Sequence, residues 1–229
     1  MRCVLCALLM SILCRGESSA AAPKQAQFVS NGKTLTYEIF EGRADGALLI
    51  FLHGASGPGV PIYREQAQFF AEHGYTVLFL HYFDTGSATP SDRTYRQWVQ
   101  AVSDLVSACR TNPEWSRSKI AVMGLSLGSS VALAAGSQMV GVDAVIDWYG
   151  SLPDEFFEGR KGMPPLLILH GERDPIIPAI NGHQLVRLCA MEHFNCASHF
   201  YTDQGHGFIG DALGDADKRT LDFLTRTLK

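Results

Sequence analysis

Three residues far apart in the chain have the types and surroundings needed for acyl transfer, beginning with Ser126. It stands between Gly124 and Gly128 in a Gly-x-Ser-x-Gly pattern, directly after the apolar run Ile120 to Met123. A strand that turns sharply into a helix at such a serine lifts the hydroxyl clear of the sheet, and the helix N-terminus directs N–H groups at negative charge. The Ala-rich stretch 126–138 supplies that helix. We therefore predict that Ser126 is a nucleophile.

A general base and a carboxylate to orient it are expected at the ends of two other strands. His206 lies between two glycines in a loop after a short apolar run, and Asp174 follows the apolar run Leu166 to His170. In this arrangement His206 takes the proton from Ser126 during attack, while Asp174 accepts a hydrogen bond from the other ring nitrogen. Asp147 is the competing carboxylate, but its place within Asp-Trp-Tyr-Gly is more typical of a buried or turn-capping residue.

Hydrogen-bond donors for a developing oxyanion are predicted in a glycine-rich loop. Residues 53–59 read His-Gly-Ala-Ser-Gly-Pro-Gly and follow an apolar run that ends at Leu52. We predict that the N–H groups of Ala55 and Leu127 form the oxyanion hole, because Leu127 directly follows the nucleophile. Ser56 is the alternative to Ala55, and a loop whose glycines only turn the chain is the alternative to both.

A metal site is not expected, although the chain has eight histidines. Four of them lie near predicted strand ends: His53, His81, His170 and His206. No pair has the helical His-x-x-x-His spacing with an acidic partner that is typical of zinc sites. A histidine at a strand end more often bonds a backbone carbonyl.

The elements that must position these residues alternate along the chain. A β-hairpin is predicted first, with strands 27–30 and 34–40 joined by an Asn-Gly turn. Further strands are expected at 47–52, 75–81, 119–123, 142–148, 166–170 and 198–202, and helices at 62–73, 91–109, 126–138, 176–191 and 216–228. Strands alternating with helices predict an α/β fold: a doubly wound, mostly parallel sheet with the hairpin at one edge. The carboxyl ends of its strands, where ligands bind in such folds, carry the candidate residues.

The first 20 residues are predicted to be a signal peptide, followed by one domain over residues 21–229. Arg2 precedes an apolar run over residues 3–14, which is too short to span a bilayer of about 30 Å. Ser18 and Ala20 have the small side chains that a signal peptidase prefers, so cleavage is expected after Ala20. An uncleaved anchor and lipidation at Cys14 are the alternatives. The prediction implies a protein exported to a periplasm or secreted.

The distribution of charge restricts the classes of binding partner, and the cysteine content bears on the cellular compartment. The formal net charge is −4, and no cluster of Lys and Arg with interleaved aromatics occurs, which argues against nucleic acid or an anionic membrane as partner. Three cysteines remain after cleavage. Cys189 and Cys196 could form a disulfide across a helix–strand connection, and three buried thiols are the alternative. The sequence predicts no oligomeric state.

With Ser126, Asp174 and His206 in this order, the chain resembles the α/β-hydrolase superfamily and, within it, the dienelactone hydrolase-like family. The resemblance rests on His-Gly-Ala-Ser-Gly after the third strand, on Pro-Pro before Leu-Leu-Ile-Leu-His-Gly-Glu-Arg-Asp-Pro, on Gly-His-Gly-Phe, and on the lack of a cap insertion. Dienelactone hydrolases proper have cysteine where this chain has Ser126, and glutamate where it has Gly54.

The resemblance implies hydrolysis of carboxylic esters or lactones through an acyl-enzyme, with no metal or organic cofactor and a small-molecule substrate. It also makes Arg93 and Arg96 candidates for binding an anionic substrate, with solvated helix residues as the alternative. A serine peptidase, an acyltransferase with the same triad and a catalytically silent binding protein are the alternative functions. Only residues 150–165 separate two predicted strands where lipases carry a lid, so we expect an open site.

Overall fold

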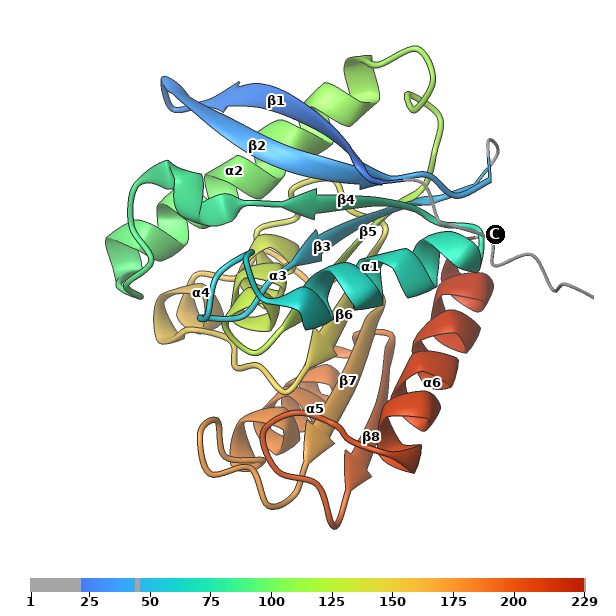
Figure 1. The fold of residues 1–229 in the computed structure, drawn as a ribbon. Coiled ribbons are helices and arrows are strands. Elements are labelled where there is room, and N and C mark those ends of the chain that lie inside the picture. Colours follow the sequence, from blue (N-terminus) through green and yellow to red (C-terminus); the bar gives the residue numbers. More distant parts are fainter. Residues whose placement is uncertain (1–21, 44–45, 229) are drawn as a thin grey trace, which may run out of the picture.

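An eight-stranded sheet runs through the computed structural model, which describes residues 22–43 and 46–228 (Figure 1). The strands are β1 (Lys24–Ser30), β2 (Lys33–Phe40), β3 (Leu48–Leu52), β4 (Thr76–Leu80), β5 (Ile120–Leu125), β6 (Ala144–Trp148), β7 (Leu166–Gly171) and β8 (Cys196–Tyr201). Their order across the sheet is β1-β2-β4-β3-β5-β6-β7-β8. β2 runs antiparallel to both neighbours and all other pairs are parallel, which confirms the predicted α/β fold with a hairpin at one edge.

The hairpin turns at Asn31 and Gly32, whose φ angles of 48° and 73° lie in the left-handed region that Asn-Gly favours. β1 begins at Lys24, three residues before the predicted start, and Lys24 pairs with Ile39. The first residues of this edge strand are polar and mostly exposed, so hydrophobic pattern did not reveal them. Strand pairing with β2 extends the element beyond its apolar part.

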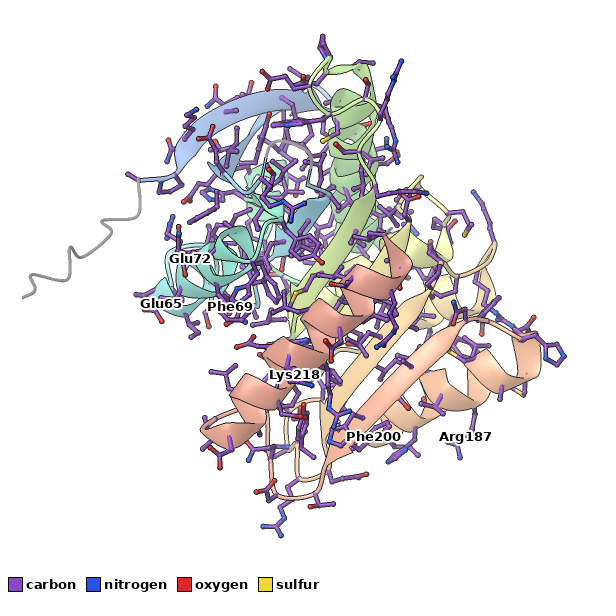
Figure 2. The ribbon with its side chains drawn as sticks, turned by 90° about the vertical axis from the view of Figure 1, so that its right-hand side faces the viewer. Glu65, Phe69, Glu72, Arg187, Phe200 and Lys218 are labelled. Atoms are coloured by element: carbon purple, nitrogen blue, oxygen red, sulfur yellow. A yellow bond between two sulfur atoms is a disulfide. The ribbon has the colours of Figure 1, made fainter. Side chains whose placement is uncertain are left out.

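Helices cover both faces of the sheet, in keeping with central strands whose side chains are all buried. They are α1 (Pro61–Glu72), α2 (Asp92–Thr111), α3 (Leu127–Ser137), α4 (Asp154–Glu158), α5 (Ile180–Glu192) and α6 (Asp211–Thr227), with a 3₁₀ turn η1 (Tyr82–Thr85). α1 and α6 pack on one face, and α2, α3 and α5 on the other (Figure 1). Phe200 of β8 lies at the far edge of the sheet (Figure 2). Its ring stacks on that of His183 of α5 with centroids 4.0 Å apart.

Two helices begin four or five residues away from the predicted start, and the other three predicted helices begin within one residue of it. α5 starts at Ile180 and not at residue 176, because the N–H groups of Ile176 and Ile177 bond the carboxylate of Asp174 and the chain forms a loop there. α6 starts at Asp211, five residues earlier than predicted. Its first turn places Leu213 against the apolar cluster under α1 and α6.

The segment between β6 and β7 contains only one short helix, α4. Phe156 of α4 is buried and its ring lies 6.4 Å from that of Tyr95 of α2, so an aromatic side chain holds the segment to the body of the fold. No large cap domain is inserted among the described residues of this connection. The sequence prediction on this point agrees with the structure.

Cys189 and Cys196 form a disulfide, with Cα atoms 6.1 Å apart, between the last turn of α5 and the first residue of β8. The third cysteine, Cys109, is buried as a thiol, and burial raises its pKa to about 12. The predicted signal peptide lies outside the described residues. None of the helices described is long and apolar enough to cross a membrane.

Candidate active site

Ser126 occupies a strained turn between β5 and α3. Its φ of 56° and ψ of −120° lie in a region that non-glycine residues rarely adopt. A Cβ on Gly124 would come within 2.1 Å of the backbone of Gly128, and one on Gly128 within 2.3 Å of the Leu52 carbonyl oxygen. Both glycines are therefore required for α3 to pass this close to the strands. Ser126 stands at the apex, half-exposed to solvent.

The structure brings Ser126, His206 and Asp174 into one hydrogen-bonded row. Ser126 Oγ lies 2.7 Å from His206 Nε2, and His206 Nδ1 lies 2.7 Å from Asp174 Oδ2. A carboxylate can only accept, so the ring nitrogen Nδ1 donates to it and Nε2 remains to accept from the serine hydroxyl. This is the tautomer that a general base toward Ser126 requires.

Asp174 is held rigidly by the loop that follows β7. Its side chain is fully buried, and its Oδ1 accepts hydrogen bonds from the N–H groups of Ile176 and Ile177 at 2.8 and 2.9 Å. Buried His170 donates from Nε2 to the Ile177 carbonyl at 2.8 Å, and the same nitrogen lies 3.6 Å from Asp174 Oδ2. The loop thus leaves one carboxylate oxygen directed at His206.

Asp147, the competing carboxylate, is fully buried near the end of β6. Ser129 of α3 donates to its Oδ1, as does the N–H of Gly150 at 2.8 Å. Burial raises the pKa of this carboxyl, although His170, Ser129 and the Gly150 N–H all favour the ionised form. Asp147 ties α3 to the turn after β6, as the sequence indicated, and makes no hydrogen bond to His206.

The loop predicted to hold the oxyanion donors begins at His53, which is wholly buried. Its ring stacks on Tyr82 at 4.2 Å, and the Tyr82 hydroxyl donates to the His53 carbonyl at 2.8 Å. Burial lowers the pKa of His53 to about 4, so the imidazole is neutral near pH 7. Ala55 of this loop lines the cavity at Ser126, and Leu127 is the first residue of α3, where N–H groups have no partner within the helix.

A cavity of about 450 Å³ opens at Ser126 and His206. Its other lining residues are mostly apolar and aromatic: Ala55, Ser56, Ile62, Tyr63, Gln66, Leu125, Trp148, Tyr149, Ile176, Gly207, Phe208 and Leu213. A volume of this size holds a small ligand with one reactive polar end.

Sequence reasoning missed the aromatic wall of this cavity. Tyr149 has a φ of 47°, and its ring packs edge-on against His206 at 5.1 Å and against Phe208 at 5.0 Å. Tyr63 comes from α1, on the other side of the cavity. Two signals were available in the sequence: the dipeptide Trp148–Tyr149 at a strand end and the phenylalanine after Gly207. Neither signal predicts that the rings are in contact.

Arg93 and Arg96 lie on α2 and do not line the cavity. Arg96 is exposed and forms an ion pair with Glu155 of α4, and Arg93 is exposed as well. A role for either in binding an anionic substrate remains a prediction. Within the described residues no three His, Cys, Asp or Glu side chains are grouped so that they could hold a metal ion.

Comparisons with known proteins show the family and the fold that this chain shares. The family model described as "Dienelactone hydrolase family" matches residues 50–227. The polyketide transferase grgF of Penicillium sp is 31% identical over 110 residues, which are 47% of this chain and 37% of that protein. The match thus spans little more than a third of the length of that curated relative.

Solved structures share the fold at low sequence identity. The dienelactone hydrolase of Anabaena variabilis superposes with a TM-score of 0.73 at 16% identity, over 91% of this chain and 100% of that one. The Pyrococcus furiosus esterase Pf2001 gives a TM-score of 0.74 at 16% identity, over 90% and 93%. Thermogutta terrifontis esterase 2, in a structure phosphorylated by paraoxon, gives 0.75 at 16% identity, over 90% and 95%.

The family match covers more than half of the chain and includes Ser126, Asp174 and His206. It confirms the resemblance seen in the sequence motifs. The chain belongs to the dienelactone hydrolase family.

Proposed function

We propose that the protein hydrolyses carboxylic esters or lactones of small soluble substrates through an acyl-enzyme on Ser126. The observation that carries the proposal is the hydrogen-bonded row from Ser126 Oγ through His206 to Asp174, with 2.7 Å at each step, at the wall of a mostly apolar cavity. A serine in this arrangement is activated by removal of its proton at the moment of attack.

In the first half of the reaction Ser126 Oγ bonds to the ester carbonyl carbon while its proton passes to His206 Nε2. The carbonyl electron pair moves onto oxygen, which the N–H groups of Ala55 and Leu127 stabilise; one such donor is typically worth about 3–4 kcal/mol of barrier. His206 then gives its proton to the departing alkoxide. Asp174 stabilises the positively charged imidazolium throughout.

In the second half, water replaces the alcohol. His206 takes a proton from the water, the hydroxide oxygen bonds to the acyl carbon, and the acyl–Oγ bond breaks as the proton returns to Ser126. The carboxylic acid product leaves through the open cavity. Besides the ester and water, the proposed steps use only side chains and N–H groups of this chain.

The test is Ser126→Ala with a fluorophosphonate probe and a panel of acyl esters, lactones and short peptides. We expect ester turnover to fall by about 10⁴-fold or more and labelling to vanish, while the circular dichroism spectrum stays that of the parent. Turnover of the variant close to the parent's would refute the assignment of the nucleophile. Cleavage of peptides without cleavage of esters would mean that the protein is a peptidase and not an esterase.

Acyl transfer is a second candidate, because the curated relative with 31% identity is a polyketide transferase. The same acyl-enzyme reacts with an alcohol or amine in place of water if that acceptor binds in the cavity. Adding acceptors of graded size to an ester assay and measuring the ratio of transfer to hydrolysis distinguishes the two. A ratio that rises only in proportion to acceptor concentration, with no saturation, supports hydrolysis.

We also propose that the chain is exported, with residues 1–20 removed as a signal peptide. The Cys189–Cys196 disulfide supports this, because disulfides persist in oxidising compartments. Mass spectrometry of the protein from its native source should find an N-terminus at Ala21 and one titratable thiol after denaturation without reductant. Three titratable thiols would contradict an oxidising location.

A further inference from the structure

The phenol of Tyr63 lies beside the nucleophile, in space that Gly54 leaves free. A Cβ added to Gly54 would come within 2.5 Å of Tyr63 Oη, and the same point lies 3.5 Å from Ser126 Cβ. The phenol oxygen and the serine side chain therefore both border the space that Gly54 leaves free. Glycine at position 54 is needed because a side chain there would displace the phenol.

The start of α1 positions this phenol. Pro61 is the first residue of the helix, and the N–H of Tyr63 bonds the Val60 carbonyl at 3.3 Å. The glycine-rich loop thus leads straight into the turn that carries Tyr63. The residue is only 8% exposed, and what remains exposed lines the cavity that holds Ser126 and His206.

The phenolic proton is available to a substrate. Burial raises the pKa of Tyr63 and a hydrogen bond from the Gly54 backbone opposes the shift, so the hydroxyl stays protonated at neutral pH. Its oxygen makes no side-chain hydrogen bond among those found in residues 22–43 and 46–228, in contrast to Tyr82 and Tyr201, whose hydroxyls donate to His53 O and Asp215.

We propose that the Tyr63 hydroxyl is a third donor to the oxyanion of the tetrahedral intermediate, beside the N–H groups of Ala55 and Leu127. The inference rests on the proposed serine esterase function. Tyr63 keeps its proton throughout: the Ser126 proton goes to His206, and the phenol only shortens its hydrogen bond as charge develops on the substrate oxygen. Ala55 directly follows Gly54, the residue beside which the phenol oxygen lies, and both Ala55 and Tyr63 line the cavity at Ser126.

Tyr63→Phe tests the proposal, with Tyr75→Phe as the matched control. Tyr75→Phe removes the same hydroxyl from a half-buried tyrosine that bonds Thr225 outside the cavity. For an ester that the parent turns over, we expect Tyr63→Phe to lower kcat by about 100-fold with little change in KM, as for removal of one oxyanion donor. The control should keep the parent's kcat.

A trifluoromethyl ketone inhibitor separates a catalytic role from a structural one. It forms a hemiketal oxyanion on the serine, so its inhibition constant should rise in Tyr63→Phe by about the factor by which kcat/KM falls. A purely structural role would lower the thermal midpoint and leave this inhibition constant unchanged. A kcat within threefold of the parent's, or a loss confined to KM, overturns the proposal.

Gly54→Ala supplies a second, independent variant. It should reduce kcat by displacing the phenol, and it should do little further damage in a Tyr63→Phe background, where the clashing oxygen is gone. Equal losses in both backgrounds would contradict the proposal. If the parent shows neither ester turnover nor fluorophosphonate labelling, the serine esterase function fails and this inference fails with it, whereas a fully active Tyr63→Phe removes only the inference.

Discussion

Asp174 follows β7 and Asp147 lies within the neighbouring strand β6, and both side chains are buried, but only Asp174 meets a histidine at the cavity. Asp174 stands three residues beyond β7, in a loop whose N–H groups bond one oxygen and leave the other to His206. Asp147 is still within β6, where the hydroxyl of Ser129 and the N–H of Gly150 share one oxygen and the other has no partner in the described part of the chain. Burial alone therefore does not make a carboxylate useful to the chemistry.

His170 lies between the two carboxylates and has no exposed surface. Its Nε2 bonds the Ile177 carbonyl and lies 3.6 Å from Asp174 Oδ2, and its charge would favour the ionised form of Asp147. His206, by contrast, keeps 22% of its side chain exposed and faces Ser126. His206, in a loop over the cavity, is therefore placed to exchange a proton with Ser126, whereas His170, enclosed in β7, holds the backbone at Ile177.

The largest loss of activity is expected for Asp174→Asn. The amide oxygen can still accept from Ile176 and Ile177, but the amide nitrogen donates to His206 Nδ1 and forces the proton onto Nε2, where it blocks acceptance from Ser126. We expect kcat to fall by about 10⁴-fold with the fold retained. Steady-state kinetics and a thermal melt check this, with Asp147→Asn as the matched control that should keep most of the activity. Equal losses in the two variants would remove the distinction between the carboxylates.

His170 variants test whether the enclosed histidine positions the loop of Asp174. His170→Asn cannot reach the Ile177 carbonyl, whereas the longer amide of His170→Gln places its nitrogen near the original Nε2. We expect kcat to fall by about 10- to 100-fold in the Asn variant, because small displacements of a catalytic group are costly, and to recover in part in the Gln variant. Equal activity in the two variants would show that the hydrogen bond to Ile177 does not position Asp174.

Asp147→Ala should affect stability more than catalysis. The change leaves the Ser129 hydroxyl and the Gly150 N–H without their acceptor, and an unsatisfied buried donor costs about 1–3 kcal/mol. Urea denaturation should find a free energy of unfolding lower by that amount, and a smaller loss for Asp147→Asn, whose amide oxygen still accepts. A larger loss of kcat than of stability would mean that Asp147 acts in the chemistry after all.

Asp217 of α6 is a third carboxyl to compare with Asp174 and Asp147, because it does not belong to the proposed catalytic row. Burial raises its pKa to about 6, although Gln66, which bonds it, and His73 favour the ionised form. Between its ordinary value of 3.8 and about 6 the folded state binds more protons than the unfolded state, so stability falls as pH rises through this window. For a half-buried group the effect should be about 1 kcal/mol.

Asp217→Asn is the variant that checks this slope. Unfolding by urea at several pH values between 4 and 7 should give a difference between parent and variant that changes through the window and is constant above it. A difference independent of pH would mean that solvent screens Asp217 fully. The same series on Tyr75→Phe, which changes no carboxyl, provides the baseline.

Local pattern was enough to predict Ser126 as nucleophile, His206 as base, and the fold class. Ser126 needs glycines on both sides because strand and helix nearly touch there, and a buried strand running into such a turn is visible in consecutive residues. The loop glycines beside His206 and the apolar strand before Asp174 are equally local signals. The alternation of apolar runs and helical stretches predicts the parallel sheet. The positions of Cys189 and Cys196 on either side of a helix–strand connection indicated the disulfide.

Tertiary structure decided which distant side chains share a cavity and which partners they find. Residues 176–179 read as helix in pattern, but Asp174 competes for their N–H groups and keeps them in a loop. Arg96 pairs with Glu155, and Tyr63 comes to rest beside Ser126, although each pair is separated by more than fifty positions. Such contacts depend on how helices cross the sheet, which is set by the packing of whole faces. The spacing of residues along the chain predicts single helices and strands, so it does not predict these contacts between distant elements.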